Sequence, residues 1–307
     1  MKYSVVIPVY NSQDIVAETV RRTLEFFQAE GLEHEIVLVN DGSTDGSWDV
    51  IATIARSQKN VIAINLLKNY GQHTANLCGF REASGDYIIT MDDDLQNPPE
   101  EISHLIAQAA QGYDLVIGQF RQKKHALYRR LGTLLVGAIN RRIFGSPKDL
   151  VLTNFRIIRR DVVDRVCQYS TSYPYIPGLV LMFSHQRVNV MVEHATRSHG
   201  KSNYNMWKIL KLVATILFNY SSYPLRLVAG AGLVIAGTSF LLGLYYLFAA
   251  LVHGSSVPGW TTLVVLLSFF NGMTILMLSM LGEYSVRLIS QISSSDSYHV
   301  KDRVQAR

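Results

Sequence analysis

The amino-acid sequence predicts an α/β protein with a mainly parallel sheet flanked by helices, followed by two long apolar helices. In the first half of the chain, short β-branched runs alternate with segments of helical pattern, which is typical of parallel strands joined by right-handed crossovers. Residues 227–282 contain no Asp, Glu, Lys or Arg. An uncharged stretch of this length, interrupted at 254–259, is typical of a membrane-inserted pair of helices. A buried hairpin in a soluble core explains two such successive runs poorly.

Composition and charge narrow the function classes. The chain has 307 residues, an apolar fraction of 48% and a net charge of +5, and basic residues stand beside apolar stretches at 128–131 and 140–143. This pattern favours an anionic membrane surface over nucleic acid as a partner, and no aromatic-basic RNA motif or zinc-finger spacing is present. Cys78 and Cys167 form no CxxC motif, which predicts reduced thiols in a cytosolic domain. The first residues lead directly into a strand, so we expect no signal peptide.

The first element is a nearly continuous apolar run at residues 2–10, as expected of a strand covered on both faces. Pro8 ends its pairing, and Asn11 with Ser12 is expected to cap a helix over about 13–29. The same alternation repeats along the chain. It predicts strands at 35–39, 61–67, 87–91 and 114–118, and helices that end near residues 57, 83 and 111.

The next segment, residues 123–144, predicts an amphipathic helix with arginines near both ends, which suits a membrane interface. A core helix with solvated arginines explains the same pattern equally well. Further strands are predicted at 154–159 and 187–193, and a short helix at 162–168. Residues 206–220 mix lysines with large apolar residues and predict a second interfacial helix.

Polar residues at the ends of the predicted strands are the first functional signal. Asn11, Asp41, Asn69 and residues 92–94 all fall at carboxyl ends, where open parallel sheets bind their ligands. A purely structural sheet has no need for polar groups along this edge. No GxGxxG or GxxxxGK[ST] motif is present, which argues against a dinucleotide fold and a P-loop. The sequence therefore predicts a nucleotide diphosphate bridged by a metal ion.

The acidic part of this edge is the stretch 87–100, which reads YIITMDDDLQNPPE. Side chains alternate along an extended chain, so Asp92 and Asp94 are expected on one side, with Gln96 just beyond. Two carboxylates suit a hard divalent ion that keeps open positions for substrate phosphates. The alternative is a solvated acidic turn before a helix N-terminus.

The apolar C-terminal region predicts a membrane topology. Segments 227–252 and 260–281 are each long enough to span a bilayer. Lys and Arg flank the pair at both ends and are missing from the connecting loop, so the positive-inside rule places both termini in the cytosol. The expected domains are a cytosolic catalytic domain at 1–205, an interfacial helix at 206–225, two transmembrane helices within 226–283 and a cytosolic tail at 284–307.

Four motifs in order, VVIPVYN, VNDGSTDGS, NYGQHTA and MDDDLQNPPE, resemble those of family 2 glycosyltransferases with the GT-A fold. From about residue 3 to 292 the chain is similar to polyprenyl-phosphate glycosyltransferases, especially bacterial undecaprenyl-phosphate transferases of the formamido-arabinose type. The resemblance implies an inverting, metal-dependent transfer of a sugar from a nucleotide-sugar, with UDP favoured over GDP, to a polyprenyl phosphate. It further implies Mg²⁺ or Mn²⁺ as cofactor, the cytosolic face of a bacterial inner membrane, a homo-oligomer such as a tetramer, and a flippase as a partner.

The resemblance also assigns roles to individual residues. It assigns the donor's nucleotide to Pro8, Tyr10, Asn11 and Asp41, the metal ion to Asp92 and Asp94, and further donor contacts to Asp93 and Gln96. Contacts to the reacting phosphates are assigned to Arg121 and Arg129, because a planar guanidinium binds phosphate in bidentate fashion; Arg121 and Asp94 also belong to the catalytic set. A loop that closes on the diphosphate is assigned to Arg197, Lys201 and Ser202. Attraction to the membrane surface is the alternative role for the arginines.

Two positions depart from the family pattern. Relatives often carry an acid before a Phe-Arg pair, where this chain has Asn154, and a lysine in the closing loop, where this chain has Asn203. The first departure leaves a catalytic base open: Asp149 is the nearby carboxylate that could serve, and a turn residue is its simpler role. Transfer to another membrane lipid such as a diacylglycerol, and an inactive membrane scaffold that binds sugar nucleotide, are the alternative functions. The sequence leaves the sugar undetermined.

Overall fold

The structure is a computed structural model that describes residues 1–120, 127–171, 173–193, 195, 206–253, 259–293 and 297–306. The chain divides into two units. One contains Met1–Ile209 together with Ser294–Arg307, and the other contains Leu210–Ser293.

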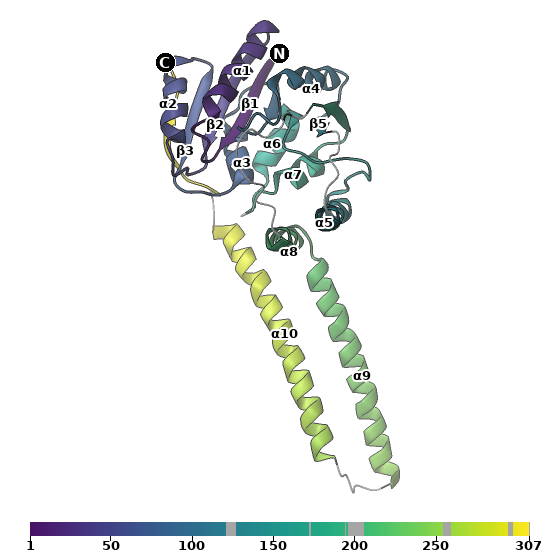
Figure 1. Ribbon diagram of the computed structural model, residues 1–307. Coiled ribbons are helices and arrows are strands. Elements are labelled where there is room, and N and C mark those ends of the chain that lie inside the picture. Colours follow the sequence, from purple (N-terminus) through teal and green to yellow (C-terminus); the bar gives the residue numbers. More distant parts are fainter. Residues whose placement is uncertain are drawn as a thin grey trace. The chain divides into compact units, whose positions relative to one another are not determined.

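Within the described residues, the first unit is built on one sheet of eight strands in the order β7-β5-β6-β4-β1-β2-β3-β8 (Figure 1). The strands are β1 Lys2–Val9, β2 Glu33–Asn40, β3 Val61–Leu66, β4 Tyr87–Thr90, β5 Leu115–Phe120, β6 Arg156–Arg159, β7 Arg187–Val192 and β8 Val300–Val304. Strands β4, β1, β2 and β3 run parallel to their neighbours among these four, and β5 runs parallel to β7. Strand β6 is antiparallel to β4 and β5, and β8 is antiparallel to β3. The prediction of a mainly parallel sheet is confirmed.

Helices cover both faces of this sheet. They are α1 Val16–Ala29, α2 Ser47–Ser57, α3 Gln72–Glu82, the 3₁₀ helix η1 Pro99–Glu101, α4 Ile102–Ala109, α5 Leu127–Phe144, α6 Arg160–Gln168 and α7 Ile176–Phe183. Alternate residues of β1, such as Val5 and Ile7, share one buried cluster with α1, α2 and α4. Helix α3 packs on the opposite face, so closely that a Cβ at Gly79 would lie 2.2 Å from a Val6 methyl carbon. The nearly continuous apolar run of β1 is therefore buried on both faces of the sheet, as the sequence predicts.

Three details differ from the sequence-based expectations. Helix α1 begins at Val16 without a side-chain cap, because Asn11 adopts a left-handed backbone conformation (φ 52°) and its side chain binds Thr44 instead. Helix α7 escaped prediction because its apolar residues lack amphipathic periodicity and are mostly buried. The C-terminal tail contributes the edge strand β8, whose charged sequence VKDRV resembles a solvated tail.

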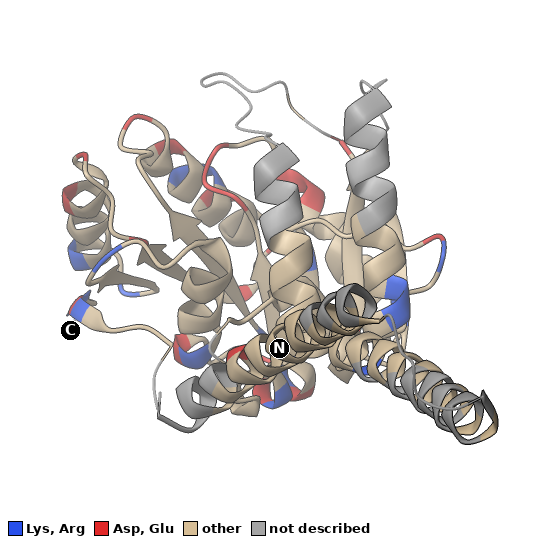
Figure 2. Cartoon of the chain, turned by 90° about the horizontal axis from the view of Figure 1, so that it is seen from below, with Lys and Arg blue, Asp and Glu red and all other residues tan. Residues whose placement is uncertain are grey.

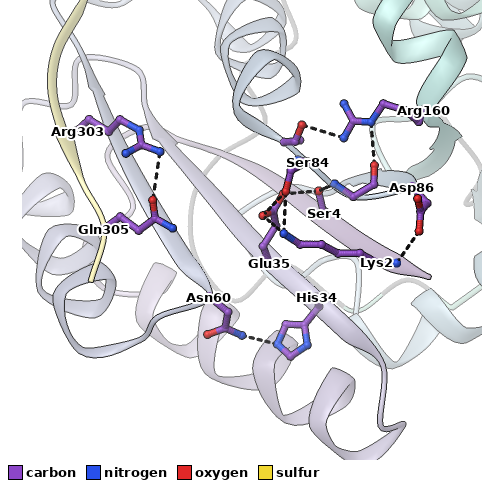
Figure 3. Close-up of polar contacts among 12 residues, drawn as sticks. Lys2, Ser4, His34, Glu35, Asn60, Ser84, Asp86, Arg160, Arg303 and Gln305 are labelled. Carbon is purple, nitrogen blue, oxygen red and sulfur yellow. Dashed lines mark hydrogen bonds and ion pairs between the residues drawn. The ribbon is translucent and has the colours of Figure 1, made fainter. Parts of the chain in front are cut away.

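At the amino ends of β1 and β2, polar contacts fasten the turn between α3 and β4 (Figure 3). The buried Glu35 accepts hydrogen bonds from the Ser4 hydroxyl (2.6 Å) and the Ser84 N–H (2.6 Å) and forms an ion pair with Lys2 (2.6 Å). Burial alone would raise the pKa of Glu35, but these hydrogen bonds outweigh burial and lower the pKa. Arg160 donates to the carbonyl groups of residues 83 and 85, which lie between α3 and β4. These contacts stabilise the end of the sheet opposite to the predicted ligand edge.

The second unit contains the long helices α9 Tyr223–His253 and α10 Trp260–Ser293 and most of α8 Met206–Tyr220, from Leu210 onward. Helices α9 and α10 approach closely, since a Cβ at Gly232 would lie 2.5 Å from the Met277 methyl group. The parts of these helices that Figure 2 colours carry few charged residues, and residues 227–282 contain no Asp, Glu, Lys or Arg. Large apolar side chains that are more than half exposed recur along both helices, including Leu227, Val234, Leu241, Tyr245, Phe248, Leu263, Leu267, Ile275, Leu276 and Leu278. In the described part of the chain, no helix combines the length and the apolar character needed for a membrane crossing. The transmembrane pair stays a prediction.

Candidate active site

A pocket of about 370 Å³ lies at the carboxyl ends of β1, β2 and β4. Its lining residues are Pro8, Val9, Tyr10, Asp41, Asn69, Gly71, Gln72, Asp92, Asp93 and Asp94. Six of the residues to which the resemblance assigns roles, from three strand ends, thus line one cavity, and Asn69 from the loop after β3 joins them. The volume lies at the lower end of the range for small-molecule sites, and the concentration of carboxylates favours a ligand that brings cations.

Asp41 shapes one wall of the pocket through its hydrogen bonds. Its Oδ1 accepts the N–H of Tyr70 (2.7 Å) and its Oδ2 accepts the N–H of Gly71 (2.8 Å). The side chain is buried, and this burial raises the pKa of Asp41 despite the two hydrogen bonds. Gly42 follows with a positive φ of 64°, and a Cβ there would lie 2.4 Å from the Lys68 carbonyl carbon. Asp41 therefore fixes the loop before α3 in addition to lining the pocket.

The end of β1 is tied to the turn after β2. The N–H of Asn11 donates to the Ser43 hydroxyl (3.0 Å), and the Asn11 Oδ1 accepts the N–H of Thr44 (2.8 Å). The neighbouring Tyr10 presents a side chain that is 48% exposed, and its N–H donates to Asp93 at 3.3 Å. Asn11 thus holds the end of β1 against the turn after β2, whereas the Tyr10 side chain is accessible to a ligand.

The three adjacent carboxylates have different environments. The Asp92 Oδ1 accepts from Gln72 Nε2 (2.6 Å) and Asn154 Nδ2 (2.8 Å), and no described residue donates to its Oδ2. Asp93 accepts the N–H of Tyr10, and burial raises its pKa to about 6. The Asp94 oxygens accept the N–H (3.1 Å) and the side-chain amide (2.5 Å) of Gln96.

The expectation that Asp92 and Asp94 share one side of an extended chain does not describe this geometry. Strand β4 ends at Thr90, and Leu95 has a positive φ of 56°, so the acidic segment turns. All three carboxylates line the pocket as a result. Like charges this close repel one another unless a cation lies among them.

Asn154 contacts Asp92 together with two buried polar residues that the sequence analysis missed, Asn76 and Arg156. The Asn154 Oδ1 accepts from Asn76 Nδ2 (3.0 Å) and Arg156 Nη2 (3.3 Å), so only its NH₂ group is left to face Asp92. An aspartate at position 154 would place a second anion beside the Asp92 carboxylate, whereas the asparagine donates a hydrogen bond to it. Arg156 is 1% exposed, its Nε donates to Thr90 Oγ1 (3.2 Å), and its burial lowers the pKa to about 10. The sequence signal for this buried group is Arg156, a basic residue flanked by apolar residues within the predicted strand 154–159.

Other predicted residues lie away from the pocket or outside the described residues. Asp149 is exposed in the turn after α5 and does not line the pocket. Arg129 belongs to α5. Arg121, Arg197, Lys201 and Ser202 lie outside the described residues. The N–H of Ala195, however, donates to the Gln96 carbonyl (3.1 Å), which holds the chain just before residues 197–202 beside the carboxylates.

Asp92 and Asp94 are the candidate ligands of a metal ion in this pocket. Across the described residues, no group of three or more His, Cys, Asp or Glu is placed to hold a metal. Asp92 and Asp94 offer hard carboxylate oxygens, and Mg²⁺ is commonly bound through one or two carboxylates plus substrate phosphates. The residues therefore fit a hard divalent ion that is completed by a ligand's phosphate oxygens.

A family model described as glycosyl transferase family 2 matches residues 4–167, more than half of the chain. The chain belongs to glycosyl transferase family 2. It is 35% identical over 303 residues to the undecaprenyl-phosphate 4-deoxy-4-formamido-L-arabinose transferase of Proteus mirabilis, covering 98% of this chain and 93% of that protein. The transferase of the same description from Photorhabdus laumondii shows the same identity and coverage. The resemblance inferred from the four motifs is confirmed.

Among solved structures, the fold is similar to that of glucosyl-3-phosphoglycerate synthase from Mycobacterium tuberculosis in complex with Mn²⁺, UDP and phosphoglyceric acid. The TM-score is 0.53 with 15% sequence identity, covering 71% of this chain and 76% of that one. At this identity the likeness concerns the fold alone. It supports the predicted GT-A-like sheet with flanking helices.

Proposed function

We propose that this glycosyltransferase moves a sugar, with inversion, from a nucleotide-sugar to undecaprenyl phosphate at the cytosolic face of a bacterial inner membrane. The observation that carries the proposal is the pocket in which Asp41 and three further carboxylates meet at the edge of the sheet. Support for the acceptor comes from the relatives, whose descriptions name undecaprenyl phosphate and which match over nearly the full length of the chain.

The donor's nucleotide would lie against Pro8, Tyr10 and the loop that Asp41 holds. Tyr10 offers a half-exposed ring for the base, while Asn11 keeps the end of β1 in place through Ser43 and Thr44. We assign UDP as the nucleotide, with GDP as the competitor to be tested. Asp93 supports this wall by binding the Tyr10 N–H.

The diphosphate would lie next to Asp92 and Asp94, with Mg²⁺ or Mn²⁺ between. Asn154 and Gln72 hold the Asp92 Oδ1, which leaves Oδ2 to face the ion, and Gln96 orients Asp94. When bound there, a divalent cation supplies positive charge against the departing diphosphate. Arg197, Lys201 and Ser202 are proposed to close over the same phosphates, starting from the segment that Ala195 fastens to Gln96.

The acceptor is proposed to approach through its phosphate, with Arg121 and Arg129 as the cations that bind it. A phosphate oxygen would attack the anomeric carbon of the sugar as the bond to the diphosphate breaks. A phosphate monoester has a second pKa of about 6 by analogy with phosphoserine, so it is largely ionised near neutrality. The reaction therefore needs little help from a general base, in agreement with an amide at position 154.

Replacing Asn154 with Ala is expected to lower the transfer rate about tenfold, the low end of the effect of residues that hold a metal ligand.

Asp149→Asn is expected to keep most of the activity, because Asp149 lies in an exposed turn. Steady-state rates of both purified variants check this. A positioned general base typically contributes ~10²–10⁴-fold, so a loss of that size in Asp149→Asn, with donor binding intact, would make Asp149 the base.

We also propose that lipid covers α9 and α10, which together form a hairpin with both termini in the cytosol. The support is the row of exposed apolar side chains on both helices and the absence of Asp, Glu, Lys and Arg from residues 227–282. Apolar surface on this scale is unfavourable in water. A homo-oligomer would cover part of the same surface, and a flippase partner is a further expectation from the resemblance.

Cysteine labelling is expected to report this topology. In a background with Cys78→Ala and Cys167→Ser, Ser255→Cys should react with an impermeant thiol reagent added to intact spheroplasts. Lys301→Cys, on exposed β8, should react only after the membrane is permeabilised. The reverse pattern would place the pocket on the wrong side for a cytosolic donor, and labelling of both sites in intact spheroplasts would exclude the hairpin.

The acceptor class is tested by competition. Purified protein with a radiolabelled nucleotide-sugar pool is given undecaprenyl phosphate, a diacylglycerol or both, and label in the extracted lipid is identified. We expect label only on the polyprenyl phosphate. Label on the diacylglycerol would favour the alternative lipid acceptor, and nucleotide binding without label on any lipid would favour the scaffold.

A further inference from the structure

A row of polar side chains crosses three strands between the C-terminal tail and the pocket. Asn40 at the end of β2 is paired in register with Asn65 of β3, and Asn65 is paired with Asp302 of β8. The two asparagines are 2% and 7% exposed, whereas Asp302 is exposed at the edge of the sheet. Burying amide groups is unfavourable unless their hydrogen bonds are satisfied, so this row has to be bonded throughout.

The bonds form one continuous chain that runs in one direction. The Asn11 N–H donates to Ser43 Oγ (3.0 Å), and the Ser43 hydroxyl donates to Asn40 Oδ1 (2.5 Å). Asn40 Nδ2 then donates to Asn65 Oδ1 (2.8 Å), and Asn65 Nδ2 donates to the Asp302 carboxylate (3.0 Å). The chain links the end of β1 to the C-terminal strand.

The carboxylate at one end fixes the direction of this hydrogen-bond chain. A backbone N–H can only donate, and an ionised carboxylate can only accept. With Asp302 at one end, Asn65 must present its NH₂ group to β8 and its oxygen to Asn40, and Asn40 must present its oxygen to Ser43. An acceptor at position 302 therefore selects the orientation of both amides in which Asn40 Oδ1 accepts the Ser43 hydroxyl, while Ser43 Oγ accepts the N–H of Asn11.

We infer that Asp302 is a positioning residue for the donor pocket, and that β8 is part of the support of this pocket as well as a cover for the edge of β3. Covering the edge requires backbone pairing alone; it does not require two buried asparagines aimed at the turn after β2. The hydrogen-bond chain ends at the turn after β2, and this turn carries Asp41, which lines the pocket. The place of Asp302 at the end of this hydrogen-bond chain is independent of the proposed function, whereas the expected effect on donor affinity rests on that function.

The test compares three variants of the full-length protein in detergent. Asp302→Ala removes the acceptor, Asp302→Asn retains an acceptor oxygen, and Arg303→Ala is the matched control. Arg303 is the next residue of β8, and its side chain donates to Glu82 of α3 (3.1 Å) and does not take part in the hydrogen-bond chain. Arg303→Ala therefore loosens the attachment of the tail without changing the hydrogen-bond chain.

Hydrogen–deuterium exchange of the peptide that covers residues 40–45 is measured without ligand, and UDP and GDP are titrated separately. We expect Asp302→Ala to speed exchange in this peptide and to weaken UDP binding about 2- to 10-fold, the effect of one net hydrogen bond. Asp302→Asn should restore both values to near wild type, and Arg303→Ala should leave both unchanged.

Unchanged exchange in Asp302→Ala, or an equal change in Arg303→Ala, would overturn the positioning role. If wild-type protein binds neither nucleotide, the donor assignment fails, while the exchange data still decide whether Asp302 orders the turn. Faster exchange with unaltered UDP affinity would overturn the part of the inference that concerns the donor pocket.

Discussion

Asp94→Asn is expected to abolish sugar transfer, with a loss of more than about 100-fold. That loss exceeds the 10–100-fold typical of residues that only support a metal ligand, because the substitution removes a proposed ligand itself. The Asp94 carboxylate lies in the pocket and bonds to its neighbour Gln96, so the fold should tolerate the amide. Transfer rate, Mn²⁺ affinity by calorimetry and melting temperature are measured together.

Glu100→Gln is the matched control, since Glu100 is an exposed carboxylate on the same acidic segment that pairs with Arg22 at 2.7 Å. It should keep wild-type activity and Mn²⁺ affinity. Full activity of Asp94→Asn, or transfer that EDTA does not affect, would remove the metal assignment from this site.

Asp41→Asn is expected to weaken UDP binding on the order of 10- to 100-fold. Each Asp41 oxygen accepts one backbone N–H, from Tyr70 and Gly71. An amide can accept only one of them, and its NH₂ group would oppose the other. Leaving a buried donor unsatisfied costs about 1–3 kcal/mol, and the loop that moves in response carries Gly71 of the pocket wall.

Asp45→Asn is the control that distinguishes destabilisation of the turn from loss of a carboxylate that lines the pocket. Asp45 also accepts backbone N–H groups, from Gln13 and Ser47, but it does not line the pocket. We expect it to lower the melting temperature with little change in UDP affinity. Equal loss of UDP affinity in both variants would show that Asp41 acts only through the stability of the turn.

The sequence was sufficient to predict where the pocket lies, because strand ends are local features. Asp41 and the carboxylates 92–94 follow recognisable β-branched runs, and the parallel topology brings their ends together. The direction of individual side chains could not be read in this way. Asp93 binds Tyr10 because the acidic segment turns at Leu95, and a periodicity of two applies only to extended chain.

Contacts between segments that are distant in the sequence could not be predicted from the residue pattern either. Asn76, Asn154 and Arg156 meet next to Asp92, although Asn76 lies on α3, Arg156 begins β6 and Asn154 lies two residues before it. Strand β8 likewise pairs with β3 across most of the chain. Its register depends on tertiary packing, because a five-residue segment with three charged side chains has little strand propensity of its own.

The central claim is tested most directly by a donor screen with purified protein, Mn²⁺ and undecaprenyl phosphate, in which the mass of the lipid product is read out. UDP-sugars and GDP-sugars are supplied one at a time, with Asp94→Asn as the inactive reference. We predict that one UDP-sugar gives a lipid heavier than undecaprenyl phosphate by one sugar residue, together with an equal amount of UDP. Failure of every donor to produce a glycosylated lipid, from protein that binds nucleotide, would contradict the assignment of this pocket to sugar transfer.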